Sequence, residues 1–282
     1  MFKRVMVAVV GLPLLIAILG CAPSWATMVL TAGMCAIGAW ELMRAAAGEK
    51  GRPLIPLTVI AAALVPVCVY LEESIRQTEL TALPVLPFTA LLGAVFLFVV
   101  FALAIHRYDG ERGIPFAAVT CAVFAALVFP LMLSCLLRLR MIPAVGMLNV
   151  FLPLAISFGS DTFALFAGML CGKHKLAPRV SPKKTVEGAV GGLIGGMVGM
   201  ALMMFVGAAV LSDAYLGPRE VVLFGVIGSV ISQIGDLSFS VIKREFGVKD
   251  YGNLLPGHGG ILDRFDSVTF AAPAVWLVLQ FL

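Results

Sequence analysis

Long apolar runs separated by short charged segments constrain this chain more than any other feature of its sequence. Hydrophobic residues make up 61% of the 282 residues and charged residues only 13%, against about 45–50% and about 25% in soluble domains. A helix that crosses a bilayer needs roughly 20 apolar residues, and several runs reach that length. The sequence therefore predicts an all-α, polytopic integral membrane protein.

We expect about nine transmembrane helices, over residues 5–22, 24–44, 54–71, 84–105, 115–137, 143–170, 187–211, 220–242 and 265–282. The sixth is long enough to be tilted or bent. The second ends in Glu41 and Arg44, which we expect at the membrane interface. Within a single membrane domain, residues 1–140 would hold the first five helices. Residues 141–282 would hold the last four, together with two charged loops that are candidate active-site loops.

The distribution of basic residues predicts the orientation of these helices, because Lys and Arg concentrate in cytoplasmic loops. With the N-terminus in the cytoplasm, 16 of the 20 Lys and Arg residues fall on cytoplasmic segments. Both charged loops, 172–186 and 243–264, then face the cytoplasm. Residues 1–21 also resemble a signal sequence ending at Cys21, but we favour a retained first helix because the next span begins almost at once.

Two acids lie inside predicted spans. An aspartate at the bilayer centre costs about 2.5–3.5 kcal/mol on insertion scales, so Asp236 in the eighth span favours a metal ligand or a proton site. The alternative is a structural carboxylate paired with a buried Lys or Arg. For Asp161 in the sixth span, the structural and functional interpretations are evenly balanced.

Asp263 and Asp266 are spaced three residues apart, which puts them on one face if the last helix begins there. Together with Asp236 they would form a cluster of hard oxygen ligands, which suits Mg²⁺. The alternative is simple capping, because acids are favourable at a helix N-terminus.

The loop that leads to these acids alternates cations with acids and glycines. Its cations Lys243, Arg244, Lys249 and Arg264, with Asp250 among them, suit the binding of phosphate groups. His258 precedes Gly259 and Gly260, whose backbone can approach a ligand closely, and its ring could donate a hydrogen bond or ligate a metal. The alternative is a basic cluster that serves as a topology signal or contacts anionic lipid.

The other charged loop contains Ser181 and Pro182, which predict a helix start with Ser as the N-cap. Lys183 and Lys184 would then lie in the first turn, where the helix dipole disfavours cations. A bound phosphate, also contacted by Thr185, would resolve that conflict, although plain positive-inside retention is the alternative. The glycine run that follows, residues 188–199, predicts close helix packing. The six cysteines, none in a CxxC pair, are expected to be core or lipid-facing residues.

The segment Ser240–Asp266 resembles the signature of phosphatidate cytidylyltransferases, also called CDP-diacylglycerol synthases. Its Ser, Lys-Arg, Lys-Asp, His-Gly-Gly and Asp-Arg-x-Asp elements all match. Gly235-Asp236-Leu237 and the segment 181–188 also resemble family motifs. One departure is Phe239, where many members carry Glu.

This resemblance implies transfer of CMP from CTP to phosphatidic acid, which gives CDP-diacylglycerol and pyrophosphate, at the cytoplasmic face of a bacterial inner membrane. It implies Mg²⁺, assisted by a monovalent cation such as K⁺, and a homodimer, with no nucleic-acid partner. We expect catalytic roles for Asp236, Asp263, Asp266, Lys243 and His258, the three aspartates binding metal. Substrate would be bound by Ser181, Lys183, Lys184, Thr185, Arg244, Lys249, Asp250 and Arg264, and the sequence leaves open which loop holds CTP.

A phosphate monoester is already anionic near neutral pH, so positioning and electrostatics should supply most of the catalysis. The rival interpretations are another CTP-dependent lipid kinase or transferase, and a transporter of an anionic substrate.

Overall fold

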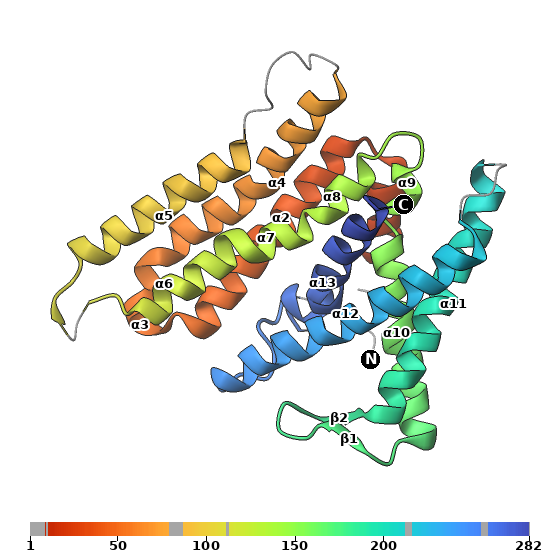
Figure 1. Ribbon diagram of the computed structural model, residues 1–282. Helices are drawn as coiled ribbons and strands as arrows, with labels where there is room; N and C mark the ends of the chain where they lie inside the picture. The colour runs from red at the N-terminus through yellow and green to blue at the C-terminus, as the bar shows by residue number, and fades with distance from the viewer. Residues whose placement is uncertain are drawn as a thin grey trace. The chain divides into compact units, whose positions relative to one another are not determined.

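The computed structural model describes residues 9, 11–78, 87–110, 113–211, 216–254 and 259–281. The described chain is helical over most of its length and divides into two compact units (Figure 1). Unit 1 comprises Met1–Met141 and Val248–Arg264, and unit 2 comprises Ile142–Gly247 and Phe265–Leu282.

Unit 1 is a bundle in which α4 packs against both α2 and α5. Val65 and Val69 of α4 form a buried apolar cluster with Leu137 and Met141. Its helices are η1 (Ala17–Cys21), α2 (Ser24–Ala46), α3 (Gly48–Gly51), η2 (Arg52–Leu54), α4 (Ile55–Gln77), α5 (Phe88–His106), α6 (Phe116–Val123), η4 (Phe124–Val128), α7 (Phe129–Leu133) and α8 (Cys135–Arg140).

Unit 2 is built on close packing of α10 against α11. A side chain added at Gly195 or Gly199 of α11 would meet the backbone carbonyl of Gly159 or Ala155 in α10, so the glycine run has the packing role predicted for it. Its elements are α9 (Gly146–Asn149), α10 (Leu152–Cys171), β1 (Lys175–Ala177), β2 (Ser181–Thr185), α11 (Val186–Leu211), α12 (Pro218–Glu245) and most of α13 (Leu262–Leu279).

Seven of the described helical stretches are long and apolar enough to cross a membrane. They are Ser24–Ala46, Gly48–Gln77, Phe88–His106, Phe116–Arg140, Gly146–Cys171, Val186–Leu211 and Pro218–Glu245. Each coincides with one of the predicted spans, and the fifth of these stretches is interrupted by the turn at Val150 and Phe151 between α9 and α10. The predicted count of nine is not confirmed. The described part of the first expected span is the short helix Gly11–Cys21, and α13 has three charged residues near its start.

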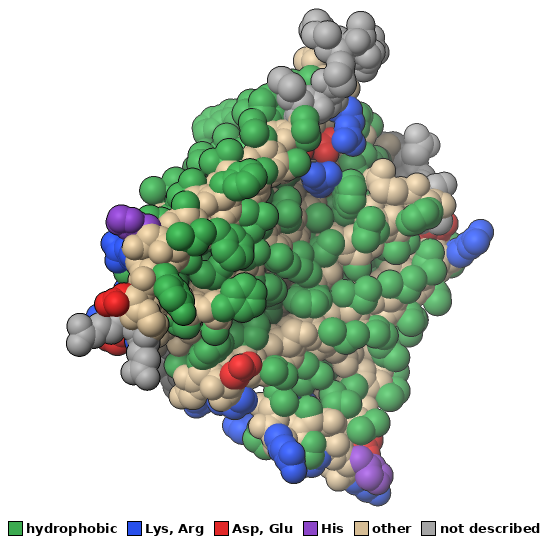
Figure 2. All heavy atoms as spheres, turned by 60° about the vertical axis from the view of Figure 1, so that its left-hand side comes forward, with side chains coloured by type: hydrophobic (Ala, Val, Ile, Leu, Met, Phe, Trp, Pro, Cys, Tyr) green, Lys and Arg blue, Asp and Glu red, His purple; other side chains and the backbone are tan. Residues whose placement is uncertain are grey.

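The outward-facing side chains of these helices are largely apolar. Figure 2 shows one face on which hydrophobic side chains cover most of the surface. In α5, only Phe96 and Val100 are buried. Lipid tails satisfy such surfaces, whereas backbone polar groups must be hydrogen-bonded within the helix. The chain is therefore a multi-pass membrane protein.

The prediction that a helix starts at Ser181 is wrong, because Ser181–Thr185 forms strand β2. This strand pairs antiparallel with β1, and Lys175 lies opposite Thr185. Helix α11 begins at Val186, where the Thr185 hydroxyl accepts a hydrogen bond from the Gly188 N–H at 3.1 Å. Thr185 therefore caps the helix in place of Ser181.

The hairpin formed by β1 and β2 is hydrogen-bonded to the first turn of α11 through Glu187. The Glu187 carboxylate accepts the backbone N–H groups of Lys173 and His174 at 3.1 and 3.2 Å, and lies 2.7 Å from Nδ1 of His174. These contacts fix the hairpin, and with it Lys183 and Lys184, against the N-terminal end of α11.

Candidate active site

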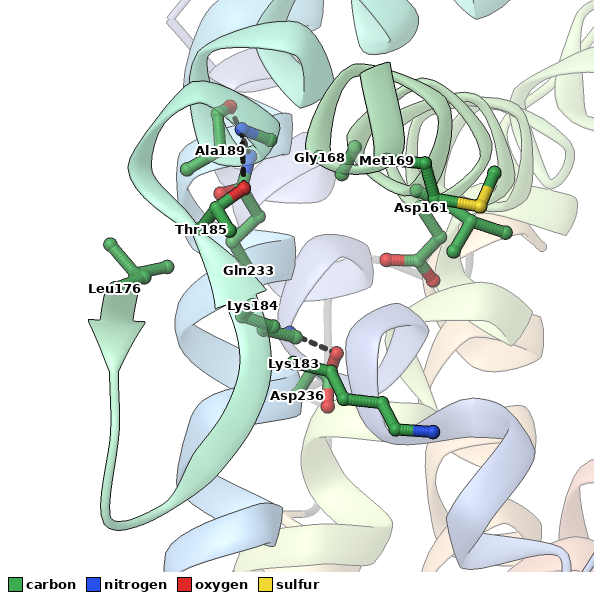
Figure 3. Close-up of a pocket in the computed structure, with 13 residues that line it drawn as sticks. Asp161, Gly168, Met169, Leu176, Lys183, Lys184, Thr185, Ala189, Gln233 and Asp236 are labelled. Atoms are coloured by element: carbon green, nitrogen blue, oxygen red, sulfur yellow. Dashed lines mark hydrogen bonds and ion pairs between the residues drawn. The ribbon is translucent and has the colours of Figure 1, made fainter. Parts of the chain in front are cut away.

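A cavity of about 560 Å³ in unit 2 collects several of the predicted site residues (Figure 3). Volumes of about 300–1,000 Å³ are usual for small-molecule sites. Its lining comes from α10, the hairpin, α11 and α12: Asp161, Ala164, Leu165, Gly168, Met169, Leu176, Lys183, Lys184, Thr185, Gly188, Ala189, Gln233 and Asp236. The pocket has a charged part and an apolar part.

The charged part is built around an ion pair between the Lys184 ammonium and the Asp236 carboxylate. Asp236 also accepts a hydrogen bond from the Ser240 hydroxyl, one helical turn further along α12, at 3.4 Å. Lys183 is the neighbour of Lys184 in β2, and adjacent side chains of a strand point to opposite sides. Within the described part of the chain, no acid lies within ion-pair distance of Lys183, which is exposed. The structural pairing considered for Asp236 is thus present, with Lys184 as the partner.

The apolar part of the pocket continues onto the outer surface of α10. Leu165 and Met169 line the cavity, yet they are 59% and 64% exposed. Leu176 of β1 lies on another side of the cavity (Figure 3). A ligand in this pocket would therefore contact charged groups at one end and lipid-facing helix surface at the other.

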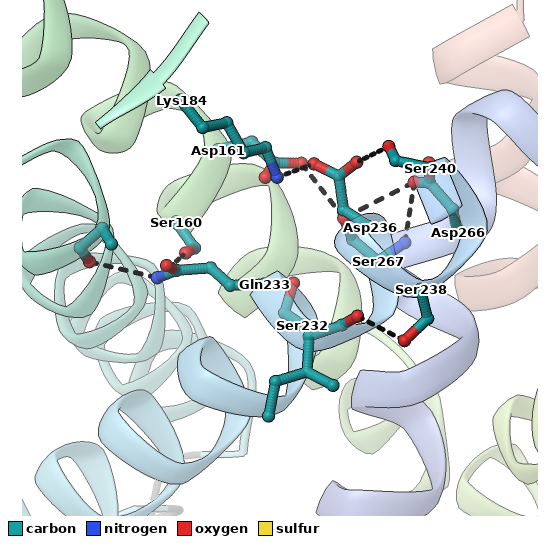
Figure 4. Close-up of polar contacts among 12 residues, drawn as sticks. Ser160, Asp161, Lys184, Ser232, Gln233, Asp236, Ser238, Ser240, Asp266 and Ser267 are labelled. Carbon is teal, nitrogen blue, oxygen red and sulfur yellow. Dashed lines mark hydrogen bonds and ion pairs between the residues drawn. The ribbon is translucent and has the colours of Figure 1, made fainter. Parts of the chain in front are cut away.

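Three carboxylates from three helices converge beside this ion pair. Figure 4 shows Asp161 of α10, Asp236 of α12 and Asp266 of α13 around Ser267. The Ser267 hydroxyl lies 3.5 Å from a carboxylate oxygen of Asp161 and 3.5 Å from one of Asp266. The Ser267 N–H donates to Asp266 at 2.8 Å. Asp236 and Asp266 thus lie close together, with Asp161 beside them.

The donor chemistry of this cluster fits a hard divalent cation, because it consists of carboxylate and hydroxyl oxygens. Beside Asp236, the positive charge is supplied by Lys184. Among the residues that the structure describes, no three His, Cys, Asp or Glu side chains stand close enough together to hold a metal ion. The carboxylates therefore have the right chemistry for Mg²⁺, in an arrangement wider than a closed coordination shell.

Two further cations of unit 2 lie at the end of α12. Lys243 is buried, and Arg244 donates from Nε to the Val180 carbonyl in the hairpin turn at 3.1 Å. Ser181 pairs with Ala177 in the hairpin and is not among the residues that line the pocket.

The other predicted site residues belong to the segment 248–264 of unit 1. Lys249, Asp250 and Arg264 are exposed there. The Asp263 carboxylate accepts the backbone N–H groups of Tyr251 and Gly260, both at 2.9 Å. These N–H groups precede α13, which begins at Leu262, so Asp263 holds the preceding loop and does not cap the helix. His258 lies outside the described residues.

Glu41, which the sequence places near the membrane interface, is buried inside the protein. Its exposed fraction is 0%, and its carboxylate accepts the backbone N–H groups of Ile261 and Leu262 at 3.1 and 3.0 Å. An acid inside an apolar run was the available sequence signal, but its partners are far away in the chain. Gln233 was not predicted either, and it donates to the Ala189 carbonyl at 3.1 Å beside the pocket.

The fold and the site together define a multi-pass helical membrane protein with a charged pocket that opens onto its apolar surface. Comparison with protein families identifies the class further. The chain belongs to the cytidylyltransferase family, whose model matches residues 2–282.

Several curated bacterial proteins are similar to this chain, and those described here are phosphatidate cytidylyltransferases. The protein from Bacillus subtilis (strain 168) is 32% identical over 185 residues, which cover 66% of this chain and 67% of that relative. The protein from Brucella abortus (strain 2308) is 38% identical over 175 residues, or 62% of this chain and 60% of the relative. The protein from Staphylococcus haemolyticus (strain JCSC1435) is 43% identical over 120 residues, or 43% of this chain and 44% of the relative.

Proposed function

We propose that this protein transfers the CMP group of CTP to phosphatidate, giving CDP-diacylglycerol and pyrophosphate. Membership of the cytidylyltransferase family and the names of its relatives support this reaction class. The observation that carries the lipid part is the pocket of unit 2, which joins a lysine to an apolar wall continuous with the exposed side of α10.

The chemistry of the pocket favours the lipid substrate over the nucleotide. Lys183 offers a positive charge to a phosphate monoester, while Leu165 and Met169 offer apolar contacts to an acyl chain. None of the thirteen described residues that line the pocket is aromatic. Stacking on an aromatic ring contributes about 1–3 kcal/mol to the binding of a base, and this pocket lacks that contact. We therefore assign the hairpin to phosphatidate.

The triphosphate of CTP would be bound by the other cations. Lys243 and Arg244 in unit 2, and Lys249 and Arg264 in unit 1, remain our candidates for this role. Asp250 and His258 remain predictions for substrate binding and catalysis. Several cations are required because a triphosphate carries several negative charges that one lysine does not balance.

The reaction requires little acid–base catalysis. An oxygen of the phosphatidate monoester forms a bond to the α-phosphorus of CTP, and the bond from that phosphorus to the bridging oxygen of pyrophosphate breaks. The nucleophile is already an anion near neutral pH, so the main barrier is to bring two anions together. Lys183 and Lys184 would lower this barrier by positioning and electrostatic stabilisation.

Mg²⁺ would be held by Asp236 and Asp266, with Asp161 beside them and Asp263 as the remaining predicted ligand. When bound, the ion would neutralise charge on the triphosphate and the leaving pyrophosphate. A monovalent cation such as K⁺ and a homodimer remain part of the proposal on the resemblance alone. The basic loops support a site that faces the cytoplasm of a bacterial inner membrane.

A turnover assay with purified protein tests this function. With CTP labelled in the cytidine, phosphatidate and Mg²⁺, we expect labelled CDP-diacylglycerol and an equal amount of pyrophosphate, and neither product after chelation. CDP with a phosphorylated lipid would identify a CTP-dependent kinase instead. Substrate flux into vesicles without turnover would identify a transporter.

A further inference from the structure

We propose that Glu41 of α2 is a positioning residue for the segment 259–264. This inference rests on the proposed function, because Asp263 and Arg264 of that segment are predicted site residues. The carboxylate of Glu41 holds the start of α13 in a single conformation and so presents both side chains to the reaction.

The contacts of Glu41 are those of a helix cap supplied by another helix. Its Oε1 accepts the Ile261 N–H at 3.1 Å and its Oε2 accepts the Leu262 N–H at 3.0 Å. Helix α13 begins at Leu262. The first N–H groups of a helix have no partner within it, and a negative charge is favourable at that end. Both oxygens of Glu41 are therefore used to fix the helix start.

Two glycines lie close to this carboxylate, Gly260 within the segment and Gly252 before it. A side chain added at Gly252 or Gly260 would collide with oxygen atoms of Glu41. Gly260 is buried, and Gly259 has a φ of +83°, which L-residues with side chains rarely adopt. The backbone thus approaches Glu41 at two points, so the conformation of the segment depends on this side chain.

Asp263 holds the same segment through other backbone groups. Its Oδ2 accepts the N–H groups of Tyr251 and Gly260. Gly260 consequently lies between two carboxylates, with Glu41 against its Cα and Asp263 on its N–H. Loss of Glu41 would release Ile261 and Leu262 and allow Asp263 to shift with them.

Burial explains why the role of Glu41 is specific. A carboxylate with an exposed fraction of 0% is costly inside an apolar helix unless hydrogen bonds compensate for it. The N–H groups at the start of α13 provide these bonds. An apolar residue at this position would suit α2 better, so the acid serves the segment 259–264 and not the helix that carries it.

Unit 1 contains a matched control for this arrangement. Glu72 of α4 is also buried, and its Oε1 accepts the N–H and the hydroxyl of Thr89 in the first turn of α5, both at 2.7 Å. Both acids accept hydrogen bonds at a helix start, but Glu72 accepts both through Oε1, and its Oε2 lies 3.9 Å from Nη2 of Arg138. Helix α5 carries none of the predicted site residues.

The test compares Glu41→Gln with Glu72→Gln in full-length purified protein, by hydrogen–deuterium exchange and steady-state kinetics. In Glu41→Gln, the single amide oxygen could accept only one of the two N–H groups. We expect several-fold faster exchange confined to residues 259–264 and a kcat lower by about 10- to 100-fold, the scale for small misplacements of a catalytic group, with little change in KM for phosphatidate. In Glu72→Gln, the amide oxygen can still accept both groups of Thr89, so this loss of a buried charge should leave exchange at 259–264 unchanged and kcat within about twofold.

Glu41→Asp keeps the charge and shortens its reach, and it decides the question if Glu41→Gln does not fold. It should give faster exchange in the same segment and a kcat between those of wild type and Glu41→Gln. Unchanged exchange at 259–264, or equal loss of kcat in the Glu41 and Glu72 variants, would overturn the proposal. A wild-type protein without cytidylyl transfer would overturn the proposed function instead, whereas the exchange comparison would still decide whether Glu41 holds the segment.

Discussion

Lys184 of β2 and Asp236 of α12 form an ion pair across 52 residues of sequence. The pair lies at the pocket of unit 2, and both side chains are partly buried, with 28% and 22% of their surfaces exposed. The Asp236 carboxylate thereby keeps a positive partner inside an apolar helix. The same contact connects the hairpin to α12.

Replacing Lys184 by Met should destabilise unit 2. Among the residues that the structure describes, this leaves Asp236 with the Ser240 hydrogen bond of 3.4 Å. An unsatisfied, partly buried polar group costs about 1–3 kcal/mol. We expect a lower midpoint of thermal unfolding in detergent, together with reduced turnover. Lys183→Met, the neighbouring change without an ion pair, is the control and should unfold like wild type. Equal stability of both variants would contradict a structural role for the pair.

Replacing Lys183 by Met should weaken the binding of phosphatidate. A hydrogen bond to a charged group contributes about 1.5–3 kcal/mol, so the KM for phosphatidate in mixed micelles should rise by about tenfold or more. The KM for CTP should stay near the wild-type value. Lys175→Met, on the other strand of the hairpin, provides the control. A selective rise in the KM for CTP would show that the hairpin binds the nucleotide.

Replacing Asp266 by Asn should abolish most turnover while the protein still inserts into the membrane. The Asn side chain can still accept the Ser267 N–H, but it removes one of the converging charges. Pyrophosphate release at saturating substrate should fall by about 100-fold or more, since a catalytic metal contributes several kcal/mol. The remaining activity should require more Mg²⁺. Asp109→Asn, at an exposed position after α5, is the control. Turnover like that of wild type would argue against the metal role of Asp266.

Replacing Gly195 by Ala should disturb the packing of α10 against α11 and so destabilise unit 2. The new methyl group would meet the Gly159 carbonyl, and overpacking of this kind typically costs about 1–3 kcal/mol. The midpoint of thermal unfolding should fall. Gly33→Ala is a suitable control, because a Cβ at Gly33 meets nothing within 4 Å. If the two variants unfold alike, the close approach at Gly195 does not stabilise the unit.

The apolar runs predicted most of the helices because hydropathy is a local property of the sequence. The predicted span 187–211 corresponds to α11 at Val186–Leu211, and 220–242 lies inside α12 at Pro218–Glu245. Helix α13 starts three residues earlier than expected. Its first turn contains charged residues that a hydropathy criterion excludes.

The hairpin could not be predicted in the same way. Ser181 and Pro182 form a good local helix start, but strand pairing with Lys175–Ala177 overrides that preference. The actual cap at Thr185 depends on where the strand ends, and this is set by pairing across the turn. Local propensity is a weak guide where a tertiary contact competes with it.

The site could be predicted only in part, for a related reason. Asp236 and Asp266 stand out because they are acids next to or inside apolar runs, and the structure brings them together (Figure 4). The contact of Asp161 with Ser267 spans 106 residues. No local pattern in the sequence indicates such a partner, so the role of Asp161 stayed undecided.

The separation of 220 residues between Glu41 and Ile261 means that α2 is synthesised well before its hydrogen-bond partners. At roughly 5–20 residues per second of translation, α2 is synthesised about 10–40 s before the N–H groups that will receive its carboxylate. During that interval, Glu41 must be hydrated or protonated. Completion of unit 1 therefore waits until Ile261 and Leu262 have been translated. A nascent chain released before residue 260 would keep an uncompensated acid in α2.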